Sequence, residues 1–189
     1  MSLYLIRHGE TEWSLSGKHT SRTDIPLTVK GEAAARNLAA RLKPIAFDVV
    51  LTSPRERARK TCELAGLSAT ARIEPLLTEW DYGDVEGLLT TEIIKSCPGW
   101  NLFRDGSPNG ESPAQITQRA DQLLSQLHSL KGNIALFTHG HFGAALATRW
   151  IALPVEKAQH FPLSTASISI LSIDERHQNT PVITRWNET

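Results

Sequence analysis

Cationic and nucleophilic side chains follow directly on short apolar runs at three points of the sequence. Arg7 and His8 come after the run LYLI, and His139 comes after NIALFT. A third run, FDVVLTS, leads into the basic segment from Ser53 to Arg57. Guanidinium groups bind phosphate oxygens in bidentate fashion, and an imidazole can attack phosphorus to form a phosphoramidate. These residue types predict chemistry on an anion with several oxygens, for which phosphate is the obvious candidate.

A parallel sheet would bring these three polar positions together. The carboxyl ends of parallel strands meet at one edge, where open α/β sheets bind their ligands. Helical patterns separate the apolar runs, and the clearest of them is a stripe formed by Ile116, Ala120, Leu123, Leu124, Leu127 and Leu130. The alternation predicts an α/β fold, a three-layer α/β/α sandwich with a mostly parallel central sheet.

Turn formers and capping residues give the expected element boundaries. Strands are predicted at 3–6, at 47–53, near residue 73, at 133–138, and in the late runs ASISILSI and PVITRW. A polar loop to about residue 27 precedes a helix in which Ala34, Leu38 and Leu42 recur every four residues. The chain is expected to form one domain over 1–189, with an inserted cap, irregular or weakly helical, at about 85–112.

Three further helices have predicted starts. In SPRE, Ser53 is the expected cap, Pro54 the first helical residue and Glu56 the partner in a capping box, with Gly66 ending the helix. Ser112, Pro113 and Gln115 repeat this pattern. The last helix is expected at 142–152.

Helical geometry distinguishes among the arginines of the basic segment. Arg55 and Arg59 are four residues apart and share a face, whereas Arg57 lies about 200° from each of them. Arg57 shares its face with Ser53 and Pro54. It is therefore the arginine expected to point back over the end of the preceding strand.

Composition narrows the class of partner. The 189 residues are 40% hydrophobic, and 20 basic residues balance 20 acidic ones, so neither nucleic acid nor a membrane surface is an expected partner. Cys62 and Cys97 lack metal-like spacing and are expected to be reduced thiols. Only two residues precede the first strand, and we expect a cytoplasmic protein without a signal peptide. The sequence leaves a homo-oligomer open.

Four motifs in this order, LIRHGETEW, SPRERARKT, EWDYGDVEG and FTHGH, resemble the histidine phosphatase superfamily. The resemblance spans 3–141 and implies a phosphoglycerate mutase-like fold and a phosphohistidine mechanism. In that mechanism His8 is the nucleophile, Arg7 and Arg57 hold the phosphoryl oxygens, His139 is a second histidine of the phosphate pocket, and Glu79 protonates the leaving alkoxide. The implied substrate contacts are Thr11, Ser14, where many relatives have asparagine, Thr20, Ser21, Gly140 and His141.

Several residues keep an alternative role at this point. Asp81, Asp84 and Glu86 compete with Glu79 as the acid. His141 competes with His139, or only lines the pocket or caps a helix. His19, His128, His160 and His177 have no motif residues beside them, so a structural role is expected for these four histidines. Packing is favoured over substrate contact for Trp80, Trp100 and Phe103.

The family resemblance allows three functions. One is a phosphatase, which transfers the phosphoryl group from His8 to water; the others are a cofactor-dependent phosphoglycerate mutase and a non-catalytic phospholigand-binding module. Trp80 stands where mutases commonly have a carboxylate-binding arginine, and the inserted segment is short, so the phosphatase is favoured. The expected substrates are phosphate monoesters of small metabolites, chiefly sugar phosphates or bisphosphates, because EWDYGDVEG and GWNLFRDGSPNGES resemble a sedoheptulose bisphosphatase-type subgroup. A broad small-molecule phosphatase and a fructose bisphosphatase-type activity are the alternatives. No metal and no cofactor are expected.

Overall fold

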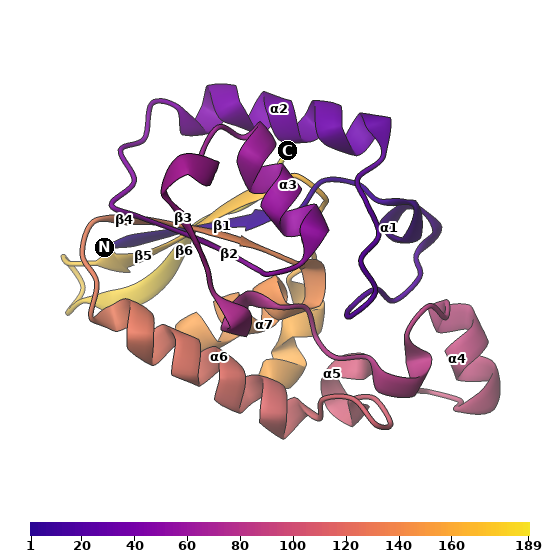
Figure 1. The fold of residues 1–189 in the computed structure, drawn as a ribbon. Coiled ribbons are helices and arrows are strands. Elements are labelled where there is room, and N and C mark those ends of the chain that lie inside the picture. The colour runs from indigo at the N-terminus through magenta and orange to yellow at the C-terminus, as the bar shows by residue number, and fades with distance from the viewer.

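The computed structural model describes residues 1–189 and has a six-stranded sheet at its centre (Figure 1). The strands are β1 (Ser2–Arg7), β2 (Val49–Thr52), β3 (Ala71–Ile73), β4 (Asn133–Thr138), β5 (Ile168–Asp174) and β6 (Thr180–Glu188). Their order across the sheet is β3-β2-β4-β1-β5-β6. The pairs among β1 to β4 are parallel, and β5 and β6 are antiparallel to their neighbours. The predicted α/β fold with a mostly parallel sheet is confirmed.

Helices cover both faces of the sheet. The α-helices are α1 (Glu12–Ser16), α2 (Val29–Leu42), α3 (Glu56–Leu64), α4 (Thr90–Ser96), α5 (Leu102–Asp105), α6 (Pro113–His128) and α7 (Gly140–Trp150). In Figure 1, α2 and α3 lie on one face, and α6 and α7 lie on the other. The hydrophobic core is accordingly split into two clusters, one under each helix pair. No helix is both long and apolar enough to cross a membrane.

The α6 helix forms as its sequence predicts. Ser112 is the N-cap, with its hydroxyl accepting from the backbone N–H of Gln115, and the Gln115 side chain accepts from the backbone N–H of Ser112. Pro113 occupies the first turn. The predicted stripe is buried along the helix, except that Leu130 lies beyond the helix end and is partly buried.

The start of α3 differs from the prediction. Arg55 is the N-cap, without a side-chain hydrogen bond, so the predicted capping box at Ser53 is wrong. The physical reason is that the Ser53 hydroxyl is paired with the ring of His139, 2.8 Å away. The prediction of the helix end is confirmed, since Gly66 follows with a positive φ of 79°.

Two other boundaries were also predicted wrongly. The α1 helix lies inside the segment expected to be a loop; its five residues are too few for a periodic pattern, and it is held by the Thr11 N-cap. The α7 helix starts at Gly140 and ends at Trp150, two residues before each expected limit.

Strand register brings the three predicted polar positions to one edge. Arg7 at the end of β1 pairs with Thr138 at the end of β4, and Thr52 at the end of β2 pairs with Phe137. The residues that follow these strands therefore meet at the carboxyl edge of the sheet. This is the arrangement that the sequence predicted for an anion site.

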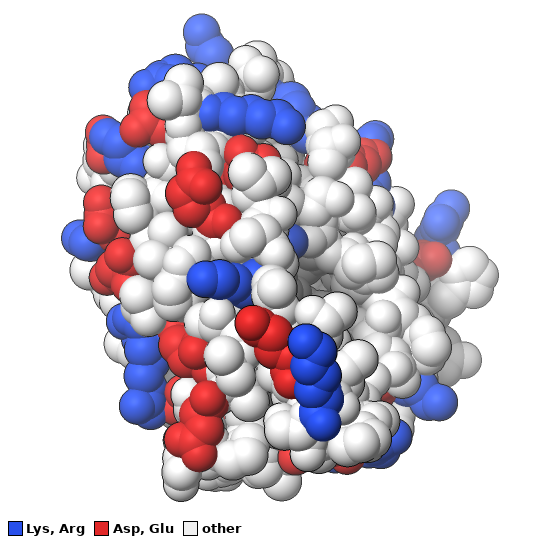
Figure 2. All heavy atoms as spheres, turned by 90° about the vertical axis from the view of Figure 1, so that its right-hand side faces the viewer, with Lys and Arg blue, Asp and Glu red and all other residues white.

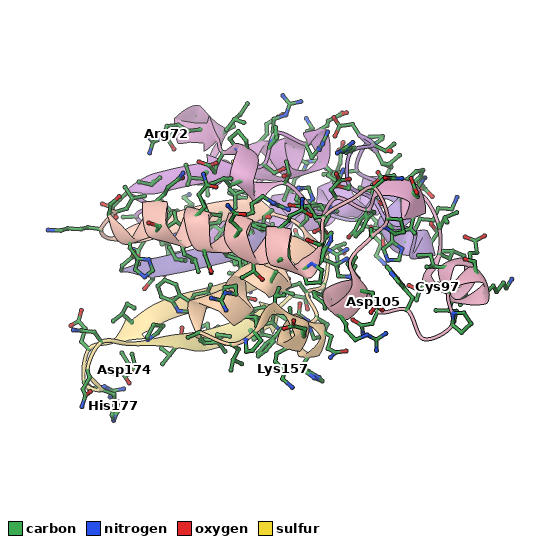
Figure 3. All side chains as sticks on the ribbon, turned by 90° about the horizontal axis from the view of Figure 1, so that it is seen from below. Arg72, Cys97, Asp105, Lys157, Asp174 and His177 are labelled. Atoms are coloured by element: carbon green, nitrogen blue, oxygen red, sulfur yellow. The ribbon has the colours of Figure 1, made fainter.

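The segment between β3 and α6 contains α4 and α5 and lies beside α1 (Figure 1). It is joined to the loop after α1, because His19 donates its backbone N–H to the carbonyl of Leu88 and Gly87 donates to the carbonyl of His19. Figure 3 shows Cys97 and Asp105 in this part, at the end opposite to the β5–β6 turn that carries Asp174 and His177. Cys97 is exposed and Cys62 is buried, and both are free thiols, as predicted.

Candidate active site

A cavity of about 380 Å³ opens at the carboxyl edge of the sheet. Figure 2 faces this end of the molecule and shows a hollow near the middle, with basic and acidic side chains interspersed around it. Of the sequence-predicted residues, those lining the cavity are Arg7, His8, Ser14, Thr20, Glu79, Gly140 and His141. The others, Thr11, Ser21, Arg57 and His139, lie behind this lining and are buried.

His8 follows β1 and is fixed in one tautomer by its own loop. Its Nδ1 lies 2.7 Å from the carbonyl oxygen of Gly9. A carbonyl only accepts, so Nδ1 carries the proton and Nε2 holds the free lone pair. Burial lowers the pKa of His8 well below its usual value, and the charges of Arg57 and Arg7 lower it further. The imidazole is therefore neutral at neutral pH, with Nε2 available to attack an electrophile.

Two guanidinium groups lie next to His8. Arg7 donates through Nη1 to the carbonyl of Leu163, and Arg57 donates through Nη1 and Nη2 to backbone carbonyls of the loop 20–23, at 3.1 Å each. The Nε atoms of both arginines are buried without a protein partner. Buried donors of this kind normally have a hydrogen-bond partner, and a phosphoryl oxygen supplies acceptors that match them.

His139 lies beside His8, with 5.2 Å between the ring centroids. Its Nε2 is 2.8 Å from the Ser53 hydroxyl, which itself accepts from the backbone N–H of Arg55. The Ser53 hydroxyl has no other protein acceptor for its proton, so we assign that proton to the bond with Nε2, which puts the proton of His139 on Nδ1, a buried atom without a protein partner. Burial, followed by the charge of Arg57, lowers the pKa of His139 well below its usual value. His139 adds a third unpaired donor to those of the two arginines.

Glu79 is the only acidic residue that lines the cavity. Its Oε1 accepts from the backbone N–H groups of Trp80 and Phe142, at 2.8 and 2.7 Å, and its Oε2 accepts from that of His141 at 3.1 Å. The carboxyl group therefore lies at the N-terminus of α7, where the helix dipole favours negative charge. Oε2 has one backbone partner and retains capacity for a proton.

The rival acids lie elsewhere. Asp81 forms an ion pair with Arg22, and Asp84 accepts from the side chain of Asn109. Glu86 accepts from backbone N–H groups at 21 and 23, which shapes the loop that Arg57 also holds. None of the three carboxyl groups lines the cavity.

The predicted substrate contacts fall into two groups. Thr11 and Ser14 cap α1 through reciprocal hydrogen bonds, and only Ser14 reaches the cavity. Thr20 lines the cavity, but Ser21 is buried and presents its carbonyl to Arg57. Gly140 is a close-approach position, because a Cβ there would lie 3.3 Å from Cζ of Arg7.

His19 and Tyr82 line the cavity and were missed as site residues. His19 was assigned a structural role, yet its ring stacks near that of His141, with 5.9 Å between centroids. The Tyr82 hydroxyl lies 2.5 Å from Nδ1 of His141. No local pattern marks either residue, because their partners are 59 to 122 positions away in the sequence. Packing was favoured over substrate contact for the aromatic side chains of this region. Phe103 lines the cavity, whereas Trp80 is fully buried in the core.

An ion pair behind the cavity holds the segment that carries Glu79. Arg119 donates to both carboxylate oxygens of Glu111, at 2.8 and 2.7 Å, and to the carbonyls of Leu76, Thr78 and Glu79. The two side chains are only 13% and 18% exposed. Removing the cation from a carboxylate that remains enclosed in the protein strongly lowers the stability of the fold.

We expect Arg119→Met to lower the free energy of unfolding by about 3 kcal/mol, the lower end of the range for buried pairs, because the largely enclosed Glu111 carboxylate would lose its cation. Denaturant unfolding of the variant and the parent protein measures this difference. The matched control is Arg149→Met, which breaks a similar pair with Asp121 at 24% and 45% exposure. Its cost should be about 1 kcal/mol or less. Equal costs for both variants would contradict the role assigned to burial.

Comparisons with known proteins find one matching family and several similar chains. Residues 3–189 match the histidine phosphatase superfamily (branch 1). An acid phosphatase of Mycobacterium tuberculosis is 41% identical over 176 residues, which cover 91% of this chain and 86% of that protein. The sedoheptulose 1,7-bisphosphatase of Saccharomyces cerevisiae is 37% identical over 81% of this chain and 68% of its own length. The solved structure of an open reading frame product from Mycobacterium tuberculosis superposes with a TM-score of 0.94 at 37% identity, covering 100% of this chain and 97% of the other.

Proposed function

This chain belongs to the histidine phosphatase superfamily, and from that premise we propose that it hydrolyses phosphate monoesters of small metabolites, chiefly sugar phosphates or bisphosphates, without a metal ion. Its phosphatase relatives support a hydrolase that acts on phosphate esters. The observation that carries the proposal is the neutral His8 ring, whose Nε2 is free and lies among guanidinium donors.

In the first half-reaction, Nε2 of His8 attacks phosphorus and the bond from phosphorus to the ester oxygen breaks. Arg7, Arg57 and His139 bind the nonbridging oxygens, whose negative charge persists through the transition state. Glu79 gives its proton to the departing alkoxide, which leaves as an alcohol. The products of this step are phosphohistidine and a Glu79 carboxylate.

In the second half-reaction, a water molecule attacks the phosphorus of phosphohistidine. Glu79 takes a proton from this water, and the bond between phosphorus and Nε2 breaks. His8 returns to its neutral form and inorganic phosphate is released. Splitting the displacement into two steps lets one carboxyl group act first as acid and then as base.

The cavity favours hydrolysis of a polyol phosphate over the mutase alternative. Apart from histidines, its only basic lining residues are Arg7 and Lys18, so few cations are available for a substrate carboxylate. Trp80, which stands where a mutase commonly has an arginine, is buried and donates its Nε1–H to the carbonyl of Glu111. The similarity to a sedoheptulose 1,7-bisphosphatase supports the sugar phosphate class.

A side-by-side assay in the presence of a chelator tests the proposal. We expect phosphate release from sugar phosphates or bisphosphates to continue without added metal, and interconversion of 2- and 3-phosphoglycerate to be poor. Released phosphate and the two phosphoglycerates are measured on the same enzyme preparation. Mutase turnover that is primed by bisphosphoglycerate and exceeds phosphate release from every sugar phosphate would overturn the proposal, as would a strict requirement for metal.

A further inference from the structure

Two imidazoles in the cavity wall have one ring nitrogen occupied and the other open. Nδ1 of His19 lies 2.9 Å from the carbonyl of Leu88, and Nδ1 of His141 lies 2.5 Å from the Tyr82 hydroxyl. Neither Nε2 has a protein partner, and both rings are largely enclosed. Both residues line the cavity. The open nitrogens are therefore available to a ligand.

The partners of the two Nδ1 atoms determine opposite hydrogen-bonding roles for the two Nε2 atoms. Because the Leu88 carbonyl only accepts, Nδ1 of His19 carries the proton and its Nε2 is an acceptor. Burial raises the pKa of Tyr82 well above its usual value, so the phenol keeps its proton, and its one protein partner is Nδ1 of His141. The proton of the neutral His141 ring is then on Nε2, which is a donor.

Aromatic neighbours hold both rings in place. His19 makes edge contacts with Tyr82 and Trp100, at centroid distances of 4.9 and 5.5 Å, and His141 makes one with Phe103 at 5.4 Å. The two imidazoles are nearly parallel, at 23° and 5.9 Å between centroids. The two rings therefore line the same part of the cavity. One oxygen that forms two hydrogen bonds of about 2.8 Å can bridge atoms up to roughly 5.6 Å apart.

We propose that His19 and His141 determine specificity by binding a substrate hydroxyl, with Nε2 of His19 accepting its proton and Nε2–H of His141 donating to its oxygen. A hydroxyl is the neutral group that both donates and accepts through one atom, so it satisfies this pair where a methylene or a carboxylate does not. His141 also donates its backbone N–H to Glu79, the proposed acid, so the pair and the acid belong to the same wall of the cavity. As part of the proposal, we assign the hydroxyl to the carbon next to the ester carbon.

This inference rests on the proposed phosphatase function and is tested with two substrates that differ by one oxygen. Glycerol 1-phosphate carries the hydroxyl next to the ester carbon, and 3-hydroxypropyl phosphate lacks it. The parent enzyme should prefer glycerol 1-phosphate by about tenfold to a hundredfold in kcat/KM, because without the hydroxyl both enclosed nitrogens lose their partner.

The informative variants are His19→Asn and His141→Asn. Asparagine places a polar atom near the position of Nδ1, so it keeps the contact to Leu88 or Tyr82 and removes only Nε2. Each variant should lower the preference by several-fold, and the double variant should bring it close to one. General damage to the fold would lower both rates and leave their ratio unchanged.

The matched control is His128→Asn. His128 stacks on Trp150, outside the cavity, with Nδ1 2.6 Å from the carbonyl of Leu124. This variant should keep the preference of the parent enzyme. A parent enzyme that hydrolyses an aryl phosphate but treats the two test substrates alike would overturn the inference and leave the phosphatase function intact. Release of phosphate from none of the three substrates would overturn both.

Discussion

His8→Ala should reduce phosphate release by a factor on the order of 10⁵ or more, the scale on which hydrolases lose activity with their nucleophile. The remaining guanidinium groups can still bind the phosphate, but no atom is left to form the bond to phosphorus. Since His8 lies at a polar strand end, the fold should persist. Phosphate release and thermal unfolding, measured on the same preparation, separate the two effects.

Detection of the covalent intermediate tests independently whether His8 is the nucleophile. Phosphohistidine is a phosphoramidate, so enzyme quenched during turnover with labelled substrate should carry label that acid removes and alkali spares. The label should be absent from His8→Ala and present in His177→Ala, a change at an exposed residue on the β5–β6 turn (Figure 3). An acid-stable label would contradict the assignment and indicate a serine or threonine nucleophile.

Glu79→Gln should have an effect that depends on the leaving group. An alkoxide needs a proton as it departs, whereas nitrophenolate does not, so the variant should lose roughly 10² to 10⁴-fold more activity on sugar phosphates than on an aryl phosphate. Glutamine keeps an oxygen that can accept from α7 but carries no acidic proton. The ratio of the two rates, compared with that of the parent enzyme, is the measurement.

The control for this prediction is Asp84→Asn, because Asp84 is a carboxylate of the same region that lies outside the cavity. It should leave the ratio of the two rates unchanged. Equal losses on both substrates in Glu79→Gln would point to another acid, with Asp81 or Glu86 next to be tested.

Much of the fold and part of the candidate site could be predicted from the local periodicity of the sequence. The apolar runs identified the strands, and their common direction followed from the helices between them. Arg57 is completely buried and faces the loop 20–23, whereas Arg59 is exposed, as the helical arithmetic predicted for that pair. The arithmetic does not hold for Ser53, Pro54 and Arg55, because they precede the first helical residue, Glu56. These features depend on residues within a few positions of one another, and such relations are visible in a sequence.

The features that sequence reasoning missed depend on contacts between distant segments. Ser53 has the properties of a helix cap, and only its partner His139, 86 positions later, shows that the hydroxyl has a different role. The role of His19 depends in the same way on Leu88 and His141, which reach it through the fold. Histidine and serine take part in many kinds of contact, so their residue type alone did not predict these partners.

The pairing of β1 has a consequence for how the molecule is made. This first strand pairs with β4, from Ser2 with Asn133 onward, and with β5. It pairs with neither β2 nor β3, which come between them in the chain. During synthesis at about 5–20 residues per second, the apolar N-terminal strand therefore waits roughly ten seconds for its first partner. Closing so long a loop is slow, and an unpaired strand is prone to association with other chains. The segment that carries the proposed nucleophile is thus made well before its partner strands, and until they emerge it is a segment to which a chaperone could bind.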